Sequence, residues 1–310
     1  MKLFNQEITT LSSTFSTVRD IIRFMVSTFN EHQLYYGHGT TNAFDEAVYL
    51  TLETLHLPVD DLNPYWDAKL LPSEINALIT VCKKRAIDKI PAPYITGKSY
   101  FMGYEFYVTN KVIIPRSFIA EIILNNGLDN YVSHPELIHN VLDLCTGNGS
   151  LAIIAADYFY ESHVIASDID KDALDVATTN IQKHGLGDRI SVVSSDLFSQ
   201  LNKYKNTFDL IITNPPYVDT QIMSTLPQEY LHEPHISLDG GVDGLLFIDN
   251  ILKNARDYLT PFGILVVEMG NNQEELMSKY SKLNITWLDT SNNEGFVFIV
   301  AKKDLDEYYS

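Results

Sequence analysis

From about residue 117 onward the chain alternates short apolar runs with helical patterns, and this alternation limits its fold more than any other feature. Strands that alternate with helices form a mostly parallel, doubly wound sheet, which binds ligands at the carboxyl ends of its strands. No helix-length spacer separates the last two runs, so we expect them to form an antiparallel pair at one edge of this α/β fold. The predicted strands are 140–144, 163–166, 190–193, 210–213, 264–268, 285–288 and 296–300, and the predicted helices are 150–158, 171–184 and 244–259.

The first hundred residues show a different pattern, in which apolar residues recur at helical spacing. The predicted helices lie within 11–30, at 45–57, and from Ser73, the expected N-cap, to Pro91. Two short strands around Gly103, extended by 112–114, predict a β-hairpin. We therefore expect a helical domain at 1–98, a hairpin linker at 99–116 and the α/β domain at 117–310.

The charge of the chain narrows the class of partner. The formal net charge is −18, and its distribution is uneven: residues 1–100 carry 9 Lys and Arg against 11 Asp and Glu, and the remainder carries 13 against 29. This excess of negative charge argues against a protein that binds the phosphate backbone of a nucleic acid over a wide surface. An acidic α/β half suits a basic protein partner. In the helical part, Lys83, Lys84 and Arg85 form a basic cluster that is either a solvated helix face or a contact to RNA.

Cysteine and histidine usage gives no sign of a metal site. Cys82 and Cys145 have no CxxC partner, which argues against structural zinc and a disulfide framework and favours a reducing compartment. His232 and His235 flank Pro234, which disrupts any regular metal-ligand spacing, so we predict no metal. The N-terminus has no apolar signal segment before the polar run at 9–13, and we expect a cytoplasmic protein.

The first predicted strand of the α/β part runs into a glycine-rich turn. Its sequence is Asp143-Leu144-Cys145-Thr146-Gly147-Asn148-Gly149, and Ser150 opens a helix. Glycines let a backbone approach a ligand closely, and the helix N-terminus supplies free N–H groups. The third glycine of the dinucleotide fingerprint is absent, and the acid at Asp143 favours a ligand with cationic groups over a pyrophosphate.

Acids stand at the next two strand ends. Asp168 is placed to accept hydrogen bonds from both hydroxyls of an adenosine ribose. Asp196 could accept from the adenine amino group, and Leu197 with Phe198 could pack on the ring. Asp170, two residues after Asp168, is a better candidate for the cap of the following helix than for a ligand-binding residue. A single acid of this kind is often a solvated loop residue, but polar groups at successive strand tips together predict a ligand site.

The fourth strand ends at Asn214-Pro215-Pro216-Tyr217. Two successive prolines fix φ and remove two backbone donors, so the chain continues neither a helix nor a sheet there. The proline carbonyls point in fixed directions, with the Asn214 amide before them and the Tyr217 ring after them. We interpret this arrangement as a binding site for a planar, nitrogen-bearing group; the alternative is an ordinary proline-rich turn.

Taken in order, these motifs resemble those of class I S-adenosylmethionine-dependent methyltransferases, which have a Rossmann-like, seven-stranded sheet. Asn-Pro-Pro-Tyr is typical of members that methylate a planar nitrogen. Ile114-Pro115-Arg116-Ser117 and the run from Gly240 to Leu245 resemble the HemK/PrmC family of protein glutamine methyltransferases. Residues 35–40 and 45–47 resemble the branch that methylates a glutamine of large-subunit ribosomal protein three.

The resemblance implies a cofactor, a substrate and a role for each motif. S-adenosylmethionine would be the cofactor, and ribosomal protein three, free or in an assembling particle, would be the substrate recognised by the helical domain. Lys83, Lys84 and Arg85 would be the candidates for contact with ribosomal RNA. The implied catalytic residues are Asn214, Pro215 and Tyr217; the implied cofactor-binding residues are Asp143, Cys145, Thr146, Gly147, Asn148, Gly149, Asp168, Asp196, Leu197 and Asn214; the implied substrate-binding residues are Asn214, Pro215, Pro216, Tyr217 and Arg116.

Three other functions stay open at this point. A release-factor glutamine methyltransferase would share the catalytic motifs but have a different N-terminal domain. A DNA adenine methyltransferase would share Asn-Pro-Pro-Tyr but would need a basic groove, which the acidic half of the chain does not favour. A cofactor-binding module without activity is disfavoured by the intact tetrapeptide.

Overall fold

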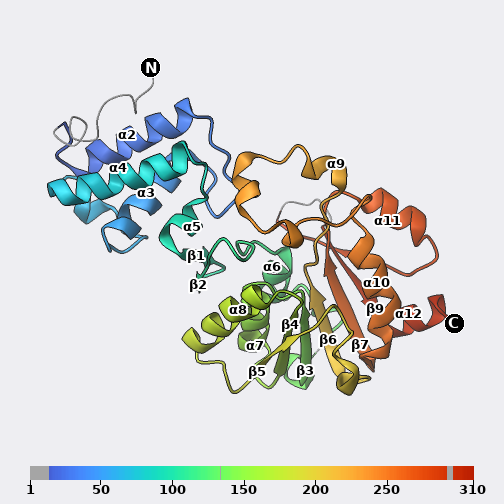
Figure 1. The fold of residues 1–310 in the computed structure, drawn as a ribbon. Helices are drawn as coiled ribbons and strands as arrows, with labels where there is room; N and C mark the ends of the chain where they lie inside the picture. The colour runs from blue at the N-terminus through green and yellow to red at the C-terminus, as the bar shows by residue number, and fades with distance from the viewer. Residues whose placement is uncertain (1–13, 133, 292–295) are drawn as a thin grey trace. The chain divides into compact units, whose positions relative to one another are not determined.

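The computed structural model describes residues 14–132, 134–291 and 296–310. The N-terminal polar run at 9–13 lies outside these ranges. The chain forms two compact units, one of residues 1–100 with 227–232 and the other of residues 101–226 with 233–310. No sequence pattern assigned residues 227–232 to the N-terminal part. Figure 1 gives the labels of the elements in both units.

The first unit is helical. Thr17 caps the helix that begins at Val18 through a capping box with Asp20, and Asn42 caps the helix that begins at Ala43. Apolar side chains from three helices form its core, including Phe29, Leu50 and Leu78. Its helices are α2 (Val18–Glu31), α3 (Ala43–Thr54), α4 (Pro72–Ala86) and α5 (Ala92–Thr96).

Three sequence-based predictions in this unit are wrong. Helix α4 ends at Ala86 and does not continue to Pro91. The N-cap of α4 is Leu71, not Ser73, because Pro72 occupies the first helical position and the Glu74 carboxylate accepts from the Leu71 N–H at 2.7 Å. Arg85 cannot contact RNA, since it is 1% exposed and forms a buried ion pair with Glu46. Lys83 and Lys84 are exposed.

The predicted hairpin is present as a two-stranded sheet of β1 (Lys98–Phe101) and β2 (Tyr104–Tyr107). Met102 and Gly103 both have positive φ, as a tight two-residue hairpin turn requires. Residues 112–114 do not extend this sheet, because they form no strand. The boundaries 1–98, 99–116 and 117–310 stay predictions, and the division between the two units falls between Tyr100 and Phe101.

The second unit is built on a seven-stranded sheet with the order β5-β4-β3-β6-β7-β9-β8. Strand β9 is antiparallel to both of its neighbours, and the other paired strands are parallel. The predicted Rossmann-like α/β fold and the antiparallel last pair are confirmed. The strands are β3 (Asn140–Leu144), β4 (His163–Asp168), β5 (Ile190–Ser194), β6 (Phe208–Thr213), β7 (Leu259–Glu268), β8 (Thr286–Leu288) and β9 (Val297–Ala301).

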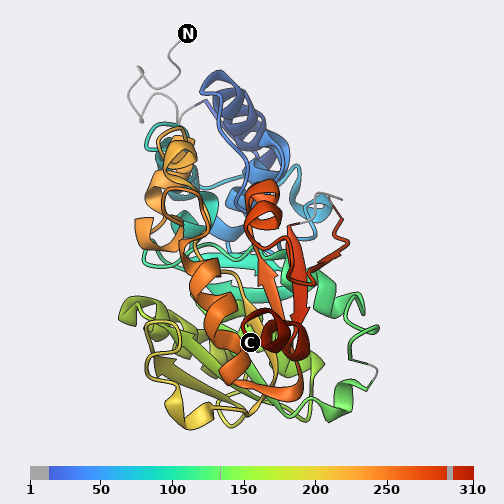
Figure 2. The ribbon, with the colours of Figure 1, turned by 90° about the vertical axis from the view of Figure 1, so that its right-hand side faces the viewer.

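Helices cover both faces of this sheet, which explains why its strands are almost continuously apolar. Figure 1 shows α7 and α8 on one side and α10 and α12 on the other, and the turned view of Figure 2 places α10 and α12 in front of the sheet. Leu142 and Leu144 pack in one cluster with residues of α10, α11 and α12, whereas the alternate residues Val141 and Asp143 are also fully buried. The helices are α6 (Phe118–Leu124), α7 (Ser150–Tyr158), α8 (Lys171–Lys183), α9 (Thr220–Met223), α10 (Leu246–Asn254), α11 (Gln273–Lys279) and α12 (Lys302–Tyr308).

The order of the strands reverses between β3 and β6. β4 and β5 lie beyond β3, and β7 lies beyond β6. At such a switch point the loops after the two central strands turn to opposite sides and leave a crevice at their carboxyl ends. Asp143 and Asn214 belong to these two strand ends, so the topology brings the first and the last predicted motif together.

Helix predictions in this unit were less accurate than strand predictions. The predicted helix 244–259 ends at Asn254, and a short 3₁₀ turn leads directly into β7. Helices α6, α9, α11 and α12 had no sequence-based prediction, because each spans seven residues or fewer and is too short to show a helical period. In α12, Leu305 is fully buried and packs with the core cluster of the sheet.

The burial of Leu305 gives a test of this C-terminal helix. Leu305→Ala should lower the free energy of unfolding by about 2–5 kcal/mol, because it opens a cavity in a packed core. Glu307→Ala, on the exposed face of the same helix, should change it by less than about 0.5 kcal/mol. Urea unfolding of both variants measures the difference; equal values would show that α12 does not pack against the sheet in solution.

Candidate active site

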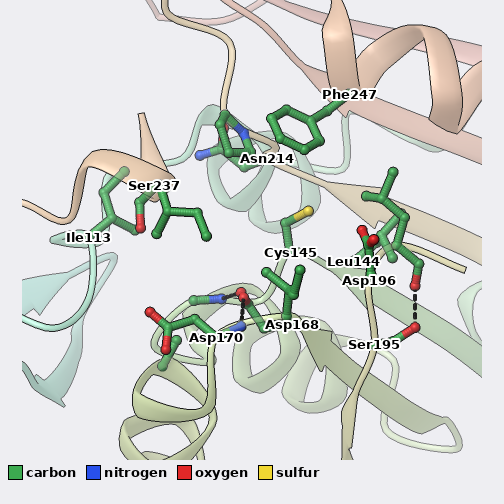
Figure 3. Close-up of a pocket in the computed structure, with 16 residues that line it drawn as sticks. Ile113, Leu144, Cys145, Asp168, Asp170, Ser195, Asp196, Asn214, Ser237 and Phe247 are labelled. Atoms are coloured by element: carbon green, nitrogen blue, oxygen red, sulfur yellow. Dashed lines mark hydrogen bonds between the residues drawn. The ribbon is translucent and has the colours of Figure 1, made fainter. Parts of the chain in front are cut away.

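A pocket opens at the carboxyl ends of β3, β4, β5 and β6, inside the second unit. It encloses about 770 Å³ including its open mouth, a size ordinary for a small-molecule site. Figure 3 shows Asn214 and Phe247 at one end and Asp168 and Asp170 at the other, with Cys145 between them. Seven of the residues predicted from the sequence line it: Cys145, Gly147, Asp168, Asp196, Leu197, Asn214 and Pro216.

The glycine-rich turn after β3 has a tightly constrained backbone. Gly147 and Gly149 both have positive φ, and a Cβ on Gly149 would lie 3.1 Å from the Cβ of Ala177. Thr146 donates its hydroxyl to an Asp143 carboxylate oxygen at 2.5 Å, and its N–H bonds the Ser167 carbonyl at 2.9 Å. Only glycine fits these positions without strain, so the turn presents its backbone to the pocket at close range.

Asp168 holds the end of β4 against this turn. One carboxylate oxygen accepts from the Gly147 N–H at 2.9 Å and the other from the Asp170 N–H at 3.0 Å. Burial raises the pKa of Asp168, although these backbone donors lower it. A carboxylate has about four acceptor positions, so each oxygen can still accept from a ligand hydroxyl in the pocket. Asp170 is the N-cap of α8, as expected, and also lines the pocket.

At the end of β5, the sequence predictions are only partly right. The Asp196 side chain is exposed and Leu197 is buried, and both line the pocket. Phe198 does not line it; its ring stacks on Tyr258 at a centroid distance of 4.6 Å, within the core. Leu197 reaches the pocket because it adopts a positive φ, which turns the chain after Asp196.

The tetrapeptide after β6 is fixed by its neighbours. The Thr213 hydroxyl donates to the Leu144 carbonyl at 2.8 Å, which joins β6 to the end of β3. A Cβ on Gly240 or Gly244 would lie 2.6 Å and 2.4 Å from Tyr217 backbone atoms, and one on Gly270 would lie 2.9 Å from the Tyr217 ring. The run from Gly240 to Leu245 thus packs directly on the backbone of Tyr217. Pro215 is buried and does not line the pocket.

A smaller cavity adjoins the main one. It is lined by Thr146 and Asn148 from the glycine-rich turn, and by Arg116 and Asn214. Arg116 forms a bidentate ion pair with Glu233, at 2.6 and 2.8 Å, and also donates to the Ile114 carbonyl. Asn148 is 1% exposed, and its side-chain NH₂ has no hydrogen-bond partner among the described residues. A buried donor without a partner is costly, so this cavity suits a ligand with an acceptor group.

Two buried acids lie beneath the site. Asp143 is fully buried, and burial raises its pKa to about 7. Glu268, at the end of β7, accepts from the Ser117 hydroxyl at 2.5 Å, and burial raises its pKa to about 7 as well.

The Cys145 thiol pKa is raised by burial, so the thiol is protonated at neutral pH and is not a nucleophile.

The histidines noted in the sequence have other partners. His232 bonds the Asp88 carbonyl at 2.9 Å, Glu233 is held by Arg116, and His235 lies 3.7 Å from an Asp239 oxygen. Within 14–132, 134–291 and 296–310, no group of three or more His, Cys, Asp or Glu side chains is placed to hold a metal ion.

In the same ranges, no helix combines the length and apolar character needed to cross a bilayer.

Sequence reasoning missed several residues of the pocket. Ile169 and Ser195 adjoin predicted strand tips and could have been inferred from their position. Ile236, Ser237 and Phe247 come from segments after the tetrapeptide, and Ile113 comes from the segment before α6; no local pattern marks them. The other missed residues are Leu144, Asp170 and Ala173.

The raised pKa of Glu268 predicts a pH dependence of stability. The folded state binds this proton more tightly than the unfolded chain, so the contribution of Glu268 to the wild-type stability is lost as pH rises from about 4 to about 7. Glu268→Gln cannot ionise. Relative to wild type, its free energy of unfolding should rise by on the order of 2–3 kcal/mol from pH 5 to pH 8. Urea unfolding of the wild type and the variant at both pH values measures this change. The same difference in free energy of unfolding at pH 5 and at pH 8 would contradict the raised pKa.

Comparison with known proteins identifies the relatives of the whole chain. A family model described as a methyltransferase domain matches residues 138–305. The ribosomal protein uL3 glutamine methyltransferase of Neisseria gonorrhoeae is 48% identical over 98% of this chain and 99% of its own length. The enzymes of the same name from Burkholderia pseudomallei and Bradyrhizobium diazoefficiens are 46% and 43% identical, over 96% and 94% of this chain and 98% and 92% of their own lengths.

Proposed function

Because the chain belongs to the family of ribosomal protein uL3 glutamine methyltransferases, we propose that it methylates the side-chain amide nitrogen of a glutamine in ribosomal protein uL3, with S-adenosylmethionine as the methyl donor. The observation that carries this proposal is that Asn214 lines the same pocket as Asp168 and Asp196. The residue suited to hold a planar amide and the acids suited to hold an adenosine therefore share one cavity.

The residues of the pocket fit such a donor. Asp168 retains acceptor capacity for ribose hydroxyls, the exposed Asp196 carboxylate suits an adenine amino group, and Leu197 offers an apolar surface to the ring. The unpartnered amide donor of Asn148 in the adjoining cavity suits a carboxylate. When bound, S-adenosylmethionine supplies an electrophilic methyl group on a sulfonium.

The protein's task is to orient a poor nucleophile. The lone pair of an amide nitrogen is delocalised into its carbonyl, as in a peptide bond. In our proposal, the Asn214 side-chain oxygen and the Pro215 carbonyl accept the two amide hydrogens, and Tyr217 forms a wall of the substrate site. The nitrogen would gain the methyl group as the bond between that group and the sulfonium sulfur breaks, which would leave a neutral thioether. Because the nitrogen becomes strongly acidic as it gains charge, it would lose one proton to solvent, and no dedicated base is needed. Positioning of this kind contributes up to about 7–11 kcal/mol in well-oriented systems.

Two variants separate orientation of the amide from binding of the donor. Asn214→Ala should lower kcat by at least about 100-fold and leave the affinity for S-adenosylmethionine nearly intact, because the reacting nitrogen is no longer oriented. Asp168→Asn should weaken donor binding by about 10- to 100-fold, since hydrogen bonds to a charged group contribute about 1.5–3 kcal/mol. Calorimetric titration with the donor and steady-state kinetics measure the two effects. Loss of donor binding in Asn214→Ala would refute its assigned role.

The substrate is tested directly with methyl-labelled S-adenosylmethionine and two unmethylated proteins, ribosomal protein uL3 and a peptide-chain release factor. We expect label on a glutamine of uL3 alone. Label on the release factor alone would keep the chemistry and overturn the substrate. Label on neither would overturn the proposed function. Contact of Lys83 and Lys84 with ribosomal RNA in an assembling particle stays a prediction.

A further inference from the structure

Six residues of the loop that follows the tetrapeptide belong to the helical unit. The chain is part of the second unit up to Leu226, enters the first unit for residues 227–232, and returns to the second unit at Glu233. We call residues 227–232 the strap. Such a short excursion must be held by specific contacts, because six residues bury little apolar surface of their own.

The main contact of the strap is a buried ion pair. Glu229 is 3% exposed, Arg85 is 1% exposed, and their side chains meet at 3.1 Å. The same Glu229 oxygen accepts from the Tyr35 N–H at 3.0 Å, while Arg85 donates to the Tyr35 carbonyl at 2.8 Å. Arg85 and Glu229 thus enclose the Tyr35 backbone between them.

A second carboxylate completes this cluster. Glu46, which is 2% exposed, accepts from Arg85 Nε at 2.5 Å and from the Thr40 hydroxyl at 2.7 Å. Burial raises the pKa of Glu229, but the Tyr35 N–H and the Arg85 guanidinium outweigh it, and the net shift is downward. Glu229 is therefore ionised at neutral pH, and the Arg85 charge is shared between two carboxylates.

The shape of the helical unit also fits the strap. The ring of Tyr230 lies 4.5 Å from that of His38 and 5.6 Å from that of Tyr35, measured between centroids. A Cβ on Gly37 would lie 2.5 Å from the Tyr230 hydroxyl oxygen, so any side chain there would displace the tyrosine. Three residues of the motif at 35–40, Tyr35, Gly37 and His38, thus form the surface on which the strap packs.

The strap continues directly into the pocket wall. Glu233, four residues after Glu229, bonds Arg116 and the Ile114 N–H within the second unit. Ile236 and Ser237 then line the pocket that contains Asn214. Figure 3 shows Ser237 next to Ile113 on the side of the pocket away from Asp196. The strap is therefore covalently continuous with one wall of the active site.

We propose that Arg85 is a positioning residue for the methylation reaction: by holding Glu229 it fixes the strap, and through the strap it fixes Ile236 and Ser237 in the wall of the pocket that contains Asn214, the residue proposed to hold the substrate amide. This inference rests on the proposed function for its substrate. Asp168 and Asp196 project from strand ends, so the hydrogen bonds proposed to hold the donor do not depend on the strap.

Two isosteric variants of the same cluster test this role. Glu229→Gln and Glu46→Gln each leave Arg85 with one carboxylate, so both should lower the melting temperature, but only the first loosens the strap. In Glu229→Gln, kcat/KM for uL3 should fall about tenfold, a loss expected when a pocket wall is displaced. Its dissociation constant for S-adenosylmethionine should not change, and Glu46→Gln should keep wild-type kinetics. Equal losses of kcat/KM in both variants would overturn the proposal.

Hydrogen exchange tests the strap without any substrate. In Glu229→Gln the amides of 227–237 should exchange faster than in wild type, and in Glu46→Gln they should not. Unchanged exchange at 233–237 would refute the link to the pocket wall even if uL3 proves not to be the substrate. If exchange is faster in Glu229→Gln but the wild-type protein does not methylate uL3, the proposed function is refuted and the link between the strap and the pocket wall stands.

A second variant tests the packing of the strap by a steric change and alters no charge. Gly37→Ala should displace Tyr230 and give the same signature as Glu229→Gln, with lower kcat/KM for uL3 and unchanged donor binding. Gly187→Ala is the matched control, because no atom lies within 4 Å of the Cβ that it adds. Wild-type kinetics in both glycine variants would contradict the seating of the strap at residues 35–38.

Discussion

The reversal of strand order between β3 and β6 is the constraint on which the active site depends. Both faces of the sheet are covered by helices, so its interior strands carry apolar side chains and polar groups gather at their ends. At the reversal, neighbouring loops turn apart and leave room for a ligand. The glycine-rich turn, Asp168, Asp196 and Asn214 reach one pocket for this reason, although 71 residues of sequence separate Asp143 from Asn214.

Two arginine–glutamate pairs, of which only Arg85–Glu229 is buried on both sides, give the loop after the tetrapeptide its second set of constraints. Arg85 holds Glu229 within the helical unit, and Arg116 holds Glu233 within the methyltransferase unit. A buried pair of this kind is costly to break, because removal of one partner leaves a desolvated charge. The loop is thereby fixed at two points four residues apart. The bidentate geometry of Arg116 also fixes the direction of the Glu233 side chain.

The strands and the strand-tip residues could be predicted from the sequence because each depends on a local pattern. An apolar run that ends in an acid or in Asn-Pro-Pro marks a buried strand and its polar end. Helices α6, α11 and α12 were missed because each has only seven residues, about two turns, which is too short to show a period. Phe198 was assigned to the pocket, although its ring packs on Tyr258. The roles of Arg85 and Arg116 could not be predicted, since each depends on a glutamate more than a hundred residues away.

The sequence by itself determined the order of the strands and of the longer helices, the α/β class and the chemical groups at the strand ends, because periodicity and turn chemistry act over a few residues. Only the tertiary structure decided which of those groups share a cavity, that Arg85 is buried and that residues 227–232 join the helical unit. These features are set by packing and by the pairing of desolvated charges between segments distant in the chain, and no local pattern encodes such partners.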